Sequence, residues 1–424
     1  MGGGTLIQLT SIPLFTGVMG YITNWTGVLM LFRPLTFHGI RVPGLRTLFP
    51  YLPRRIRILP LISYTGGLGW QGIVPSRADK MASIAVDKGL GKLGSMADFY
   101  RELEPEKIAD HLAAVAQKEI RGAVEQIMQE ENPQFWHDLP PVIKEAVHAR
   151  VRQQLPAIVH SITDEIGTNI DQVLDAKLMV IRYFSKHPEL LNELFLVMGR
   201  KELNFMKNFG LYFGIPMGFA LFGILQLAPY WWVLPLGGIV VGWVVNWLGV
   251  TMIFWPITPK RWVPWRQGLL VKRQDEVTEG YARIVADHVI TLQNVGHELL
   301  YGTRSDRTLQ LLEDSLRPSI DRAIGPARAM VRVAIGSKEY EQIRDSVAAE
   351  ATQFAPRAFN DAGFSKRQSG RIYTFVAIQM RGMSAADFVE MLRAAIRQDE
   401  WLLFFHGGAL GLIAGLLHLA IFGT

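Results

Sequence analysis

Residues 208–259 read NFGLYFGIPMGFALFGILQLAPYWWVLPLGGIVVGWVVNWLGVTMIFWPITP and contain no charged side chain. A bilayer core is about 30 Å thick, and a helix of roughly 20 apolar residues crosses it. The stretch is long enough for two such helices, which we expect at 209–228 and 233–254. They reverse at 229–232, where PYWW supplies the aromatic residues typical of a membrane interface. The stretch therefore predicts a hairpin of two membrane-spanning helices.

Two more uncharged stretches, 1–32 and 401–424, are each long enough for one membrane-spanning helix. The first has no basic residue ahead of it and is followed by Arg33 and Pro34 rather than by a small-residue cleavage site. We therefore expect a retained helix and not a signal peptide. The 44 Lys and Arg and the 38 Asp and Glu all lie between the uncharged stretches. The sequence predicts an all-α integral membrane protein with four transmembrane helices and two charged helical domains.

The expected parts follow the charge pattern directly. They are a transmembrane helix at 1–34, a helical domain at 35–208, a transmembrane hairpin at 209–256, a second helical domain at 257–401 and a last transmembrane helix at 402–424.

Basic residues precede any acidic residue after the first and the third expected spans. The first acidic residues are Asp79 and Asp275. Because short loops rich in Lys and Arg stay in the cytoplasm, we expect both helical domains to be cytoplasmic. Attraction to anionic headgroups accounts for the net charge of +6, so no nucleic-acid partner is expected. The basic residues before Asp79 include Arg33, Arg41, Arg46, Arg54, Arg55 and Arg57.

The first and third expected spans resemble each other when 13–36 is laid over 235–258. Identical pairs include Pro13/Pro235, Gly20/Gly242, Asn24/Asn246, Trp25/Trp247 and Gly27/Gly249. Beyond a loop, Arg77 aligns with Arg273, and the second spans align with Leu211 opposite Leu403. Each half reads as span, helical domain, span, which predicts a parallel tandem repeat about an axis along the membrane normal. This arrangement disfavours an inverted-repeat transporter.

The charged segments show helical periodicity and no strand or hairpin signal. Pro105 is expected near the start of a helix that ends at Asn132 and Pro133. A second helix begins near Val142 and carries apolar residues at an eleven-residue spacing. Such a stripe favours the core of a helix bundle, and contact with lipid is the alternative. The stripe comprises Val147, Val151, Leu155, Ile158, Ile162, Ile166 and Val173.

Several motifs together resemble a known family. Residues 20–25 read GYITNW and residues 30–34 read MLFRP, which is similar to the opening signature of the bacterial membrane family called domain of unknown function 445, with its YheB-like and YjiN-like members. Residues 72–77, GIVPSR, resemble the family's next signature, although Ser76 replaces a basic residue. The resemblance implies the four-span architecture and a location in the bacterial cytoplasmic (inner) membrane, and it carries over no catalytic residue.

Two asparagines lie on small-residue faces of the expected spans. Asn24 has Gly20 and Gly27 on its face, and Asn246 has Gly242 and Gly249. An Asn in lipid needs a hydrogen-bond partner, so we expect Asn24 and Asn246 to bond each other where their helices cross. Part of a path for a solute or ion is the alternative role.

Glycine at every fourth position predicts close helix packing in the second spans. The runs are Gly210, Gly214 and Gly218, then Gly407, Gly411 and Gly415. The partner helix can belong to the same chain or to another copy, so a homo-oligomer stays open.

Three arginines lie near the expected membrane surface: Arg33, Arg77 and Arg273. Each guanidinium can fork onto a lipid phosphate. For Arg77 and Arg273 an equally good alternative is a pair with Asp79 or Asp275, two residues on.

No enzyme chemistry is expected. The chain has no cysteine, and the glycines near residues 66–72 follow no strand and precede no Lys-Ser/Thr, so no nucleotide site is predicted. His406 and His418 lack nearby acids or cysteines, so we expect no metal, no cofactor and no catalytic residue.

We expect a non-enzymatic protein that binds or handles membrane lipids, or serves as a scaffold, at the cytoplasmic leaflet. A channel or transporter using an Asn-lined contact between the first and third spans is the alternative.

Overall fold

The computed structural model describes residues 3–52, 60–63, 65–324, 332–333, 335–359 and 361–423. Its contacts divide the chain into two compact units. The first unit comprises Met1–Gly89, Ile181–Tyr281 and Met380–Thr424, and the second comprises Leu90–Val180 and Ala282–Gln379. Arg54, Arg55 and Arg57 lie outside the described residues.

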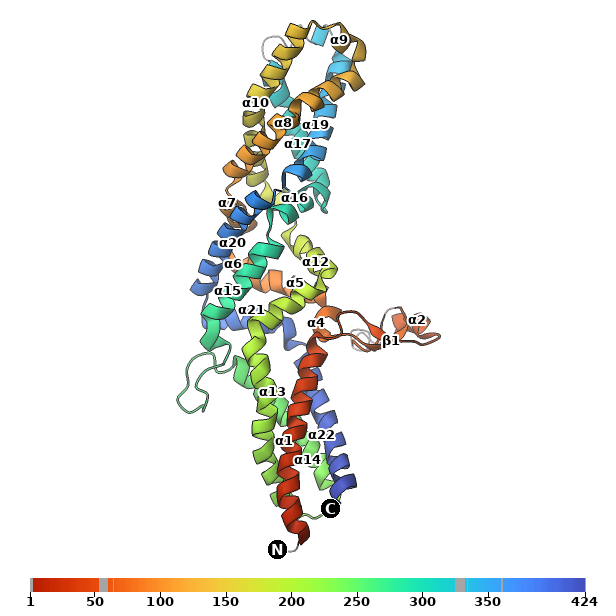
Figure 1. Ribbon diagram of the computed structural model, residues 1–424, viewed down its shortest axis with the longest axis vertical. Helices are drawn as coiled ribbons and strands as arrows, with labels where there is room; N and C mark the ends of the chain where they lie inside the picture. Colours follow the sequence, from red (N-terminus) through yellow and green to blue (C-terminus); the bar gives the residue numbers. More distant parts are fainter. Residues whose placement is uncertain are drawn as a thin grey trace. The chain divides into compact units, whose positions relative to one another are not determined.

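Four long helices form a bundle in the first unit (Figure 1). They are α1 (Gly3–Phe32), α13 (Pro188–Leu227), α14 (Val233–Phe254) and α22 (Glu400–Phe422). All four are long and apolar enough to cross a membrane, as the sequence predicts. The bounds of α14 equal the expected ones, whereas α13 begins at Pro188, well before its apolar stretch.

Glycines set how closely these helices cross. α1 packs on α13 and α14 packs on α22. A Cβ atom on Gly20 would overlap the carbonyl of Gly210, and a Cβ on Gly242 would overlap the carbonyl of Gly407. The two backbones can approach to this distance only because neither residue has a side chain.

A small antiparallel sheet in the first unit departs from the all-helical prediction for the charged segments. It pairs β1 (His38–Arg41) with β2 (Gly67–Trp70), His38 opposite Trp70 and Arg41 opposite Gly67. The strands are short, and glycine at 39, 67 and 69 removes the alternation of side chains that would have revealed them.

The first unit also holds short elements at one end of the bundle. These are α2 (Leu45–Leu48), the 3-10 helices Phe49–Tyr51 and Val271–Arg273, α4 (Ile73–Ser76), α5 (Ala78–Ala85) and α21 (Ala385–Arg397). Four helical elements contain residues of both units: the π-helical turn Val86–Leu90, α12 (Ala176–Lys186), α15 (Gln274–Ile284) and α20 (Ala362–Gly382).

The described residues of the second unit form helices joined by short connections. The elements are α6 (Gly91–Leu93), α7 (Met96–Glu102), α8 (Pro105–Glu131), α9 (Pro133–Asp138), α10 (Pro141–Thr168), α11 (Ile170–Val173), α16 (Leu292–Tyr301), α17 (Ser305–Ile324) and α19 (Ser337–Phe359), with a π-helical turn at Val285–Val289.

Contacts in the second unit join helices from both charged segments. α8 packs on α10 and on α19, and α10 packs on α17. The sequence instead suggests a separate domain for each segment, at 35–208 and 257–401. On α10, Leu155 is buried and the rest of the eleven-residue stripe on that helix is half-buried. Periodicity identifies the apolar face of a helix but not which helix covers it.

Candidate functional site: a cavity beside buried ion pairs

An apolar cavity of about 100 Å³ lies in the first unit where α1 ends and α22 begins. We call this the charged end of the bundle. Most lining side chains are apolar, and the charged ones are Glu202, Asp399 and Glu400. The lining residues are Leu31, Phe32, Ile73, Val74, Met81, Phe195, Met198, Gly199, Glu202, Leu203, Met206, Val250, Ile253, Phe254, Leu270, Leu392, Ile396, Asp399, Glu400 and Leu403.

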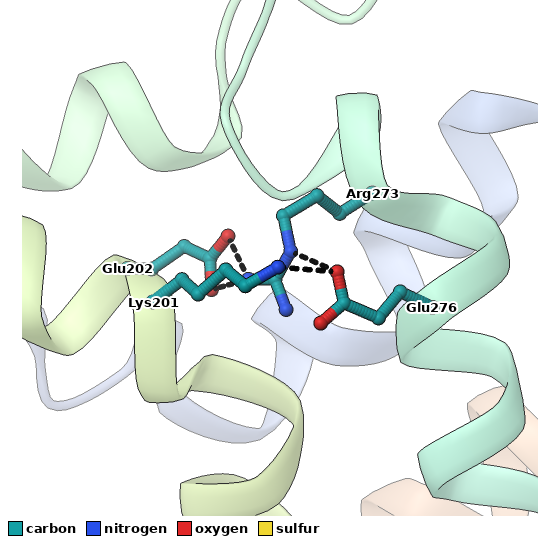
Figure 2. Close-up of polar contacts among 4 residues, drawn as sticks. All are labelled: Lys201, Glu202, Arg273 and Glu276. Carbon is teal, nitrogen blue, oxygen red and sulfur yellow. Dashed lines mark hydrogen bonds and ion pairs between the residues drawn. The ribbon is translucent and has the colours of Figure 1, made fainter.

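Glu202 on α13 forms a bidentate ion pair with Arg273 (Figure 2). The Arg273 Nη1 donates to both Glu202 carboxylate oxygens, at 2.7 and 2.6 Å. The Arg273 Nε donates to Glu276 at 2.8 Å, and Lys201 donates to the same Glu276 oxygen at 2.9 Å. Glu202 is 4% exposed, so its carboxylate is shielded from water and its negative charge is stabilised mainly by Arg273.

Protonation follows from the same contacts. Hydrogen bonds from Arg273 and Lys201 lower the pKa of the Glu276 carboxyl to about 2. The hydrogen bond to Glu276, followed by those to Glu202, raises the pKa of Arg273. Glu276 and Arg273 are therefore both charged at neutral pH.

A second buried ion pair joins Arg77 to Asp399. Their side chains are 8% and 4% exposed, and burial lowers the pKa of Arg77. Arg393 forms a third pair beside it, with two hydrogen bonds to Glu400 of 2.8 and 2.9 Å. The bond to Glu400 raises the pKa of Arg393. Each carboxylate that lines the cavity is thus neutralised by an arginine.

The structure changes the expected partners of Arg77 and Arg273. Both guanidiniums form ion pairs within the chain, with Asp399 and Glu202 rather than with Asp79 and Asp275. Asp79 instead accepts a hydrogen bond from the Ser185 hydroxyl. One signal in the sequence does point to the true partner of Arg77: Asp399 and Glu400 immediately precede the last uncharged stretch, at the same expected membrane surface.

Arg33 differs from these two arginines. Its side chain is exposed and makes no side-chain hydrogen bond or ion pair within the described part of the chain. Its carbonyl accepts a 3.2 Å hydrogen bond from Trp70 Nε1. Contact between Arg33 and a lipid phosphate stays a prediction.

The two asparagines do not bond each other. Asn24 Nδ2 donates to the Met206 carbonyl at 2.6 Å, and Asn246 Nδ2 donates to the Leu403 carbonyl at 2.7 Å. Each asparagine therefore ties its helix to the neighbour with which it packs most closely, α1 to α13 and α14 to α22. The expectation of a mutual Asn24–Asn246 bond is wrong, because the glycine crossings bring a backbone carbonyl within reach first.

The glycine candidates fall into two groups. Gly411 and Gly415 pack against the backbone of Gly238 and of Pro235, as Gly407 does against Gly242. A Cβ on Gly27 or Gly249 would make only ordinary contacts, the nearest at 3.6 and 3.7 Å. These last two glycines are not required for a close crossing.

A second cavity of about 50 Å³ lies between the four bundle helices. Its polar lining side chains are Thr16, Thr23, Asn24 and His418. Asn24 Oδ1 and His418 Nδ1 are buried without a hydrogen bond to any described residue. His418 Nε2 lies 3.2 Å from Ser11 Oγ, and His406 Nε2 lies 3.0 Å from Thr26 Oγ1.

Among the residues that the structure describes, no group of three or more His, Asp or Glu side chains is placed to hold a metal ion. No protein family, curated protein or solved structure matches the chain.

Proposed function

We propose that the protein is a non-enzymatic membrane protein that binds a lipid at the cytoplasmic leaflet, with part of an acyl chain in the cavity at the charged end of the bundle. The observation that carries this proposal is the apolar lining of that cavity. It lies at the level of Phe32 and Phe254, where two bundle helices end and the uncharged stretches give way to charged ones.

The energetics favour an apolar ligand. One water molecule needs about 10–15 Å³ of cavity volume, so this cavity has room for water. Water molecules there would nevertheless find few polar groups with which to form hydrogen bonds. A buried methylene contributes about 0.8 kcal/mol, so a few methylenes of an acyl chain suffice for retention. The arginine partners cancel the charge of the lining carboxylates, which removes the attraction for a free cation.

The test is native mass spectrometry with lipid analysis on protein extracted gently from its own membrane. Gly199→Phe fills the cavity, and Leu196→Phe, at an exposed site on the same helix, is the matched control. We expect the parent chain and Leu196→Phe to retain a defined lipid and Gly199→Phe to lose it. A parent chain without lipid, or equal retention in all three, overturns the proposal.

We also propose that the chain belongs to the domain of unknown function 445 family and consists of two copies of one unit. Both charged segments would lie in the cytoplasm of a bacterium. The contacts support the duplication, since Asn24 to Met206 parallels Asn246 to Leu403. The contacts also favour a register for the second spans that differs from the expected pairing of Leu211 with Leu403. Gly20 crosses Gly210 in the first half and Gly242 crosses Gly407 in the second, so Gly210 corresponds to Gly407. The family proposal rests on the motifs at 20–25, 30–34 and 72–77.

A path for a small solute or ion is the second candidate function, favoured by the cavity inside the bundle. Its lining runs along α1 from Ile12 to Asn24, about 18 Å of helix and more than half of a bilayer core. His418 and Asn24 bring unbonded polar atoms to it, and polar groups inside a membrane often mark a pathway.

Flux into proteoliposomes tests this second function. Ala414→Phe fills the inner cavity, and Ile413→Phe places the same side chain on the exposed face of the same helix. We expect flux of protons or alkali cations with the parent chain and with Ile413→Phe, and none with Ala414→Phe. No flux with the parent chain removes this candidate.

A further inference from the structure

We propose that the segment between α1 and α4 is a membrane-surface arm whose apolar face inserts among the headgroups of the leaflet at the charged end of the bundle. The arm comprises the described residues 35–52, 60–63 and 65–70. The inference rests on the part of the proposed function that places the bundle in a membrane, and it is independent of any lipid in the cavity.

The register of the small sheet gives the arm one apolar face. Side chains of directly paired residues lie on the same side of a sheet, and the next pair along points to the opposite side. Ile40 pairs with Leu68 and His38 pairs with Trp70, so these four share a face. Ile40 is 72% exposed and Leu68 is 48% exposed. A cross-strand pair of large apolar side chains is therefore left facing solvent within the described residues.

The described part of the arm exposes further large apolar side chains outside the sheet. Leu48, at the end of α2, is 59% exposed, and Tyr51, in the following 3-10 helix, is 86% exposed. Neighbouring exposed apolar side chains of this size are unusual on a soluble surface and indicate a partner. Tyrosine suits the membrane interface in particular, because its ring is apolar and its hydroxyl stays hydrated.

Hydrogen bonds fasten the arm at the level where α1 ends. Besides the Trp70 bond to the Arg33 carbonyl, Gln71 Nε2 donates to the Leu35 carbonyl at 2.7 Å and the Gly72 amide donates to the Pro34 carbonyl at 2.9 Å. In Figure 1, β1 and α2 project sideways from this end of α1, across the direction of the bundle. The surface of a bilayer that contains α1 would lie along the arm.

Charge selects lipid over a protein partner. From Arg33 to Arg77 the chain contains no Asp or Glu, and Arg33, Arg41 and Arg46 are exposed. Arg41 pairs with Gly67 and lies on the opposite face of the sheet from Ile40. Basic side chains on the same short segment as inserted apolar ones match the anionic headgroups and acyl boundary of a leaflet. A second copy of the arm would bring like charges together, which opposes self-association.

Because the chain contains no cysteine, a fluorophore can be attached at a single introduced cysteine without removing any other. Ile40→Cys and Leu68→Cys, each carrying an environment-sensitive fluorophore, are reconstituted in phosphatidylethanolamine–phosphatidylglycerol vesicles with a lipid quencher near the headgroups. The control is Gln153→Cys, an exposed site on α10 of the second unit, which contains none of the four candidate membrane-spanning helices. We expect quenching at least threefold greater at positions 40 and 68 than at 153.

Two further measurements test whether the basic residues contribute to insertion and whether insertion is independent of a lipid in the cavity. Arg41→Gln with Arg46→Gln should reduce quenching at position 40 in these vesicles and leave it unchanged in phosphatidylcholine alone. Quenching should persist in the Gly199→Phe background, so loss of cavity lipid does not alter the result. Equal quenching at positions 40, 68 and 153 overturns the proposal. Quenching that appears only at high protein density also overturns it, because it indicates contact between copies.

Discussion

Buried charges at the charged end of the bundle depend on partners from distant parts of the sequence. Arg77 pairs with Asp399 across 322 positions, and Arg273 pairs with Glu202 across 71. Removing one member of a buried pair takes away a compensating charge in a medium that solvates the remaining charge poorly. These pairs are therefore the residues at which a single substitution should cost the most stability.

Asp399→Asn should lower the free energy of unfolding by about 3 kcal/mol, because Arg77 would stay buried beside a neutral amide. Unfolding by SDS titration, followed by circular dichroism, measures the change. Glu276→Gln is the control: it removes an acid with an exposed side chain, while Arg273 keeps Glu202. Equal losses for the two variants would show that burial does not govern the cost.

Glu276 also predicts a dependence on pH. Its pKa is lowered from 4.5 to about 2 in the folded protein, so its ionised form stabilises the fold above about pH 4.5. This contribution is lost as the pH falls from about 4.5 to 2. The difference in unfolding midpoint between the parent chain and Glu276→Gln should therefore be constant from pH 7 to 5 and close below pH 4.5. A difference that persists unchanged at pH 2.5 contradicts the assigned hydrogen bonds.

The close distance between α1 and α13 at their crossing depends on glycine, which has no side chain, at the contact. Gly210→Ala should force the two backbones apart and lower stability by about 1–3 kcal/mol. Gly223→Ala, on the same helix but with nothing within 4 Å of the new Cβ, should be neutral or raise stability by up to about 1 kcal/mol. SDS titration of both variants compares them, and a loss at Gly223 equal to that at Gly210 would exclude the close crossing as the cause.

The elements show which parts of the fold a local pattern determines. Charge-free length was sufficient to predict α14, and proline and asparagine at the ends of α8 marked its limits. The partner of Asn24 was not predictable, because a helix face can meet any of several neighbours. Likewise, Arg77 had a nearby candidate in Asp79, and only the packing of α21 beside α5 brings Asp399 closer.

At the scale of the whole molecule, the orientation is open to a direct test in cells. Positive charge after the first and third spans predicts that the turn between α13 and α14 faces the periplasm and that the charged segments face the cytoplasm. A membrane-impermeant maleimide should label Tyr230→Cys in intact cells and label Glu193→Cys only after permeabilisation. The cysteine-free parent is the blank, and the reverse pattern would invert the topology.

The crossed ion pairs have a consequence for descent. On the proposed duplication, Arg77 of the first half meets Asp399 of the second, and Arg273 of the second meets Glu202 of the first. Such reciprocity is the mark of an isologous dimer, in which residue i meets j and j meets i. We infer that the single-copy ancestor was a homodimer whose subunits each supplied the other's counter-ion.

If two copies were joined in this way, the fusion would have allowed the two halves to diverge in sequence. In the register given by Gly210 and Gly407, the Arg393–Glu400 pair of the second half stands where the first half has Leu196 and Leu203. A substitution in a homodimer appears twice, whereas in the fused chain it appears once. On this proposed origin, divergence after fusion accounts for the asymmetry at the charged end, where an ion pair in the second half stands opposite leucine in the first.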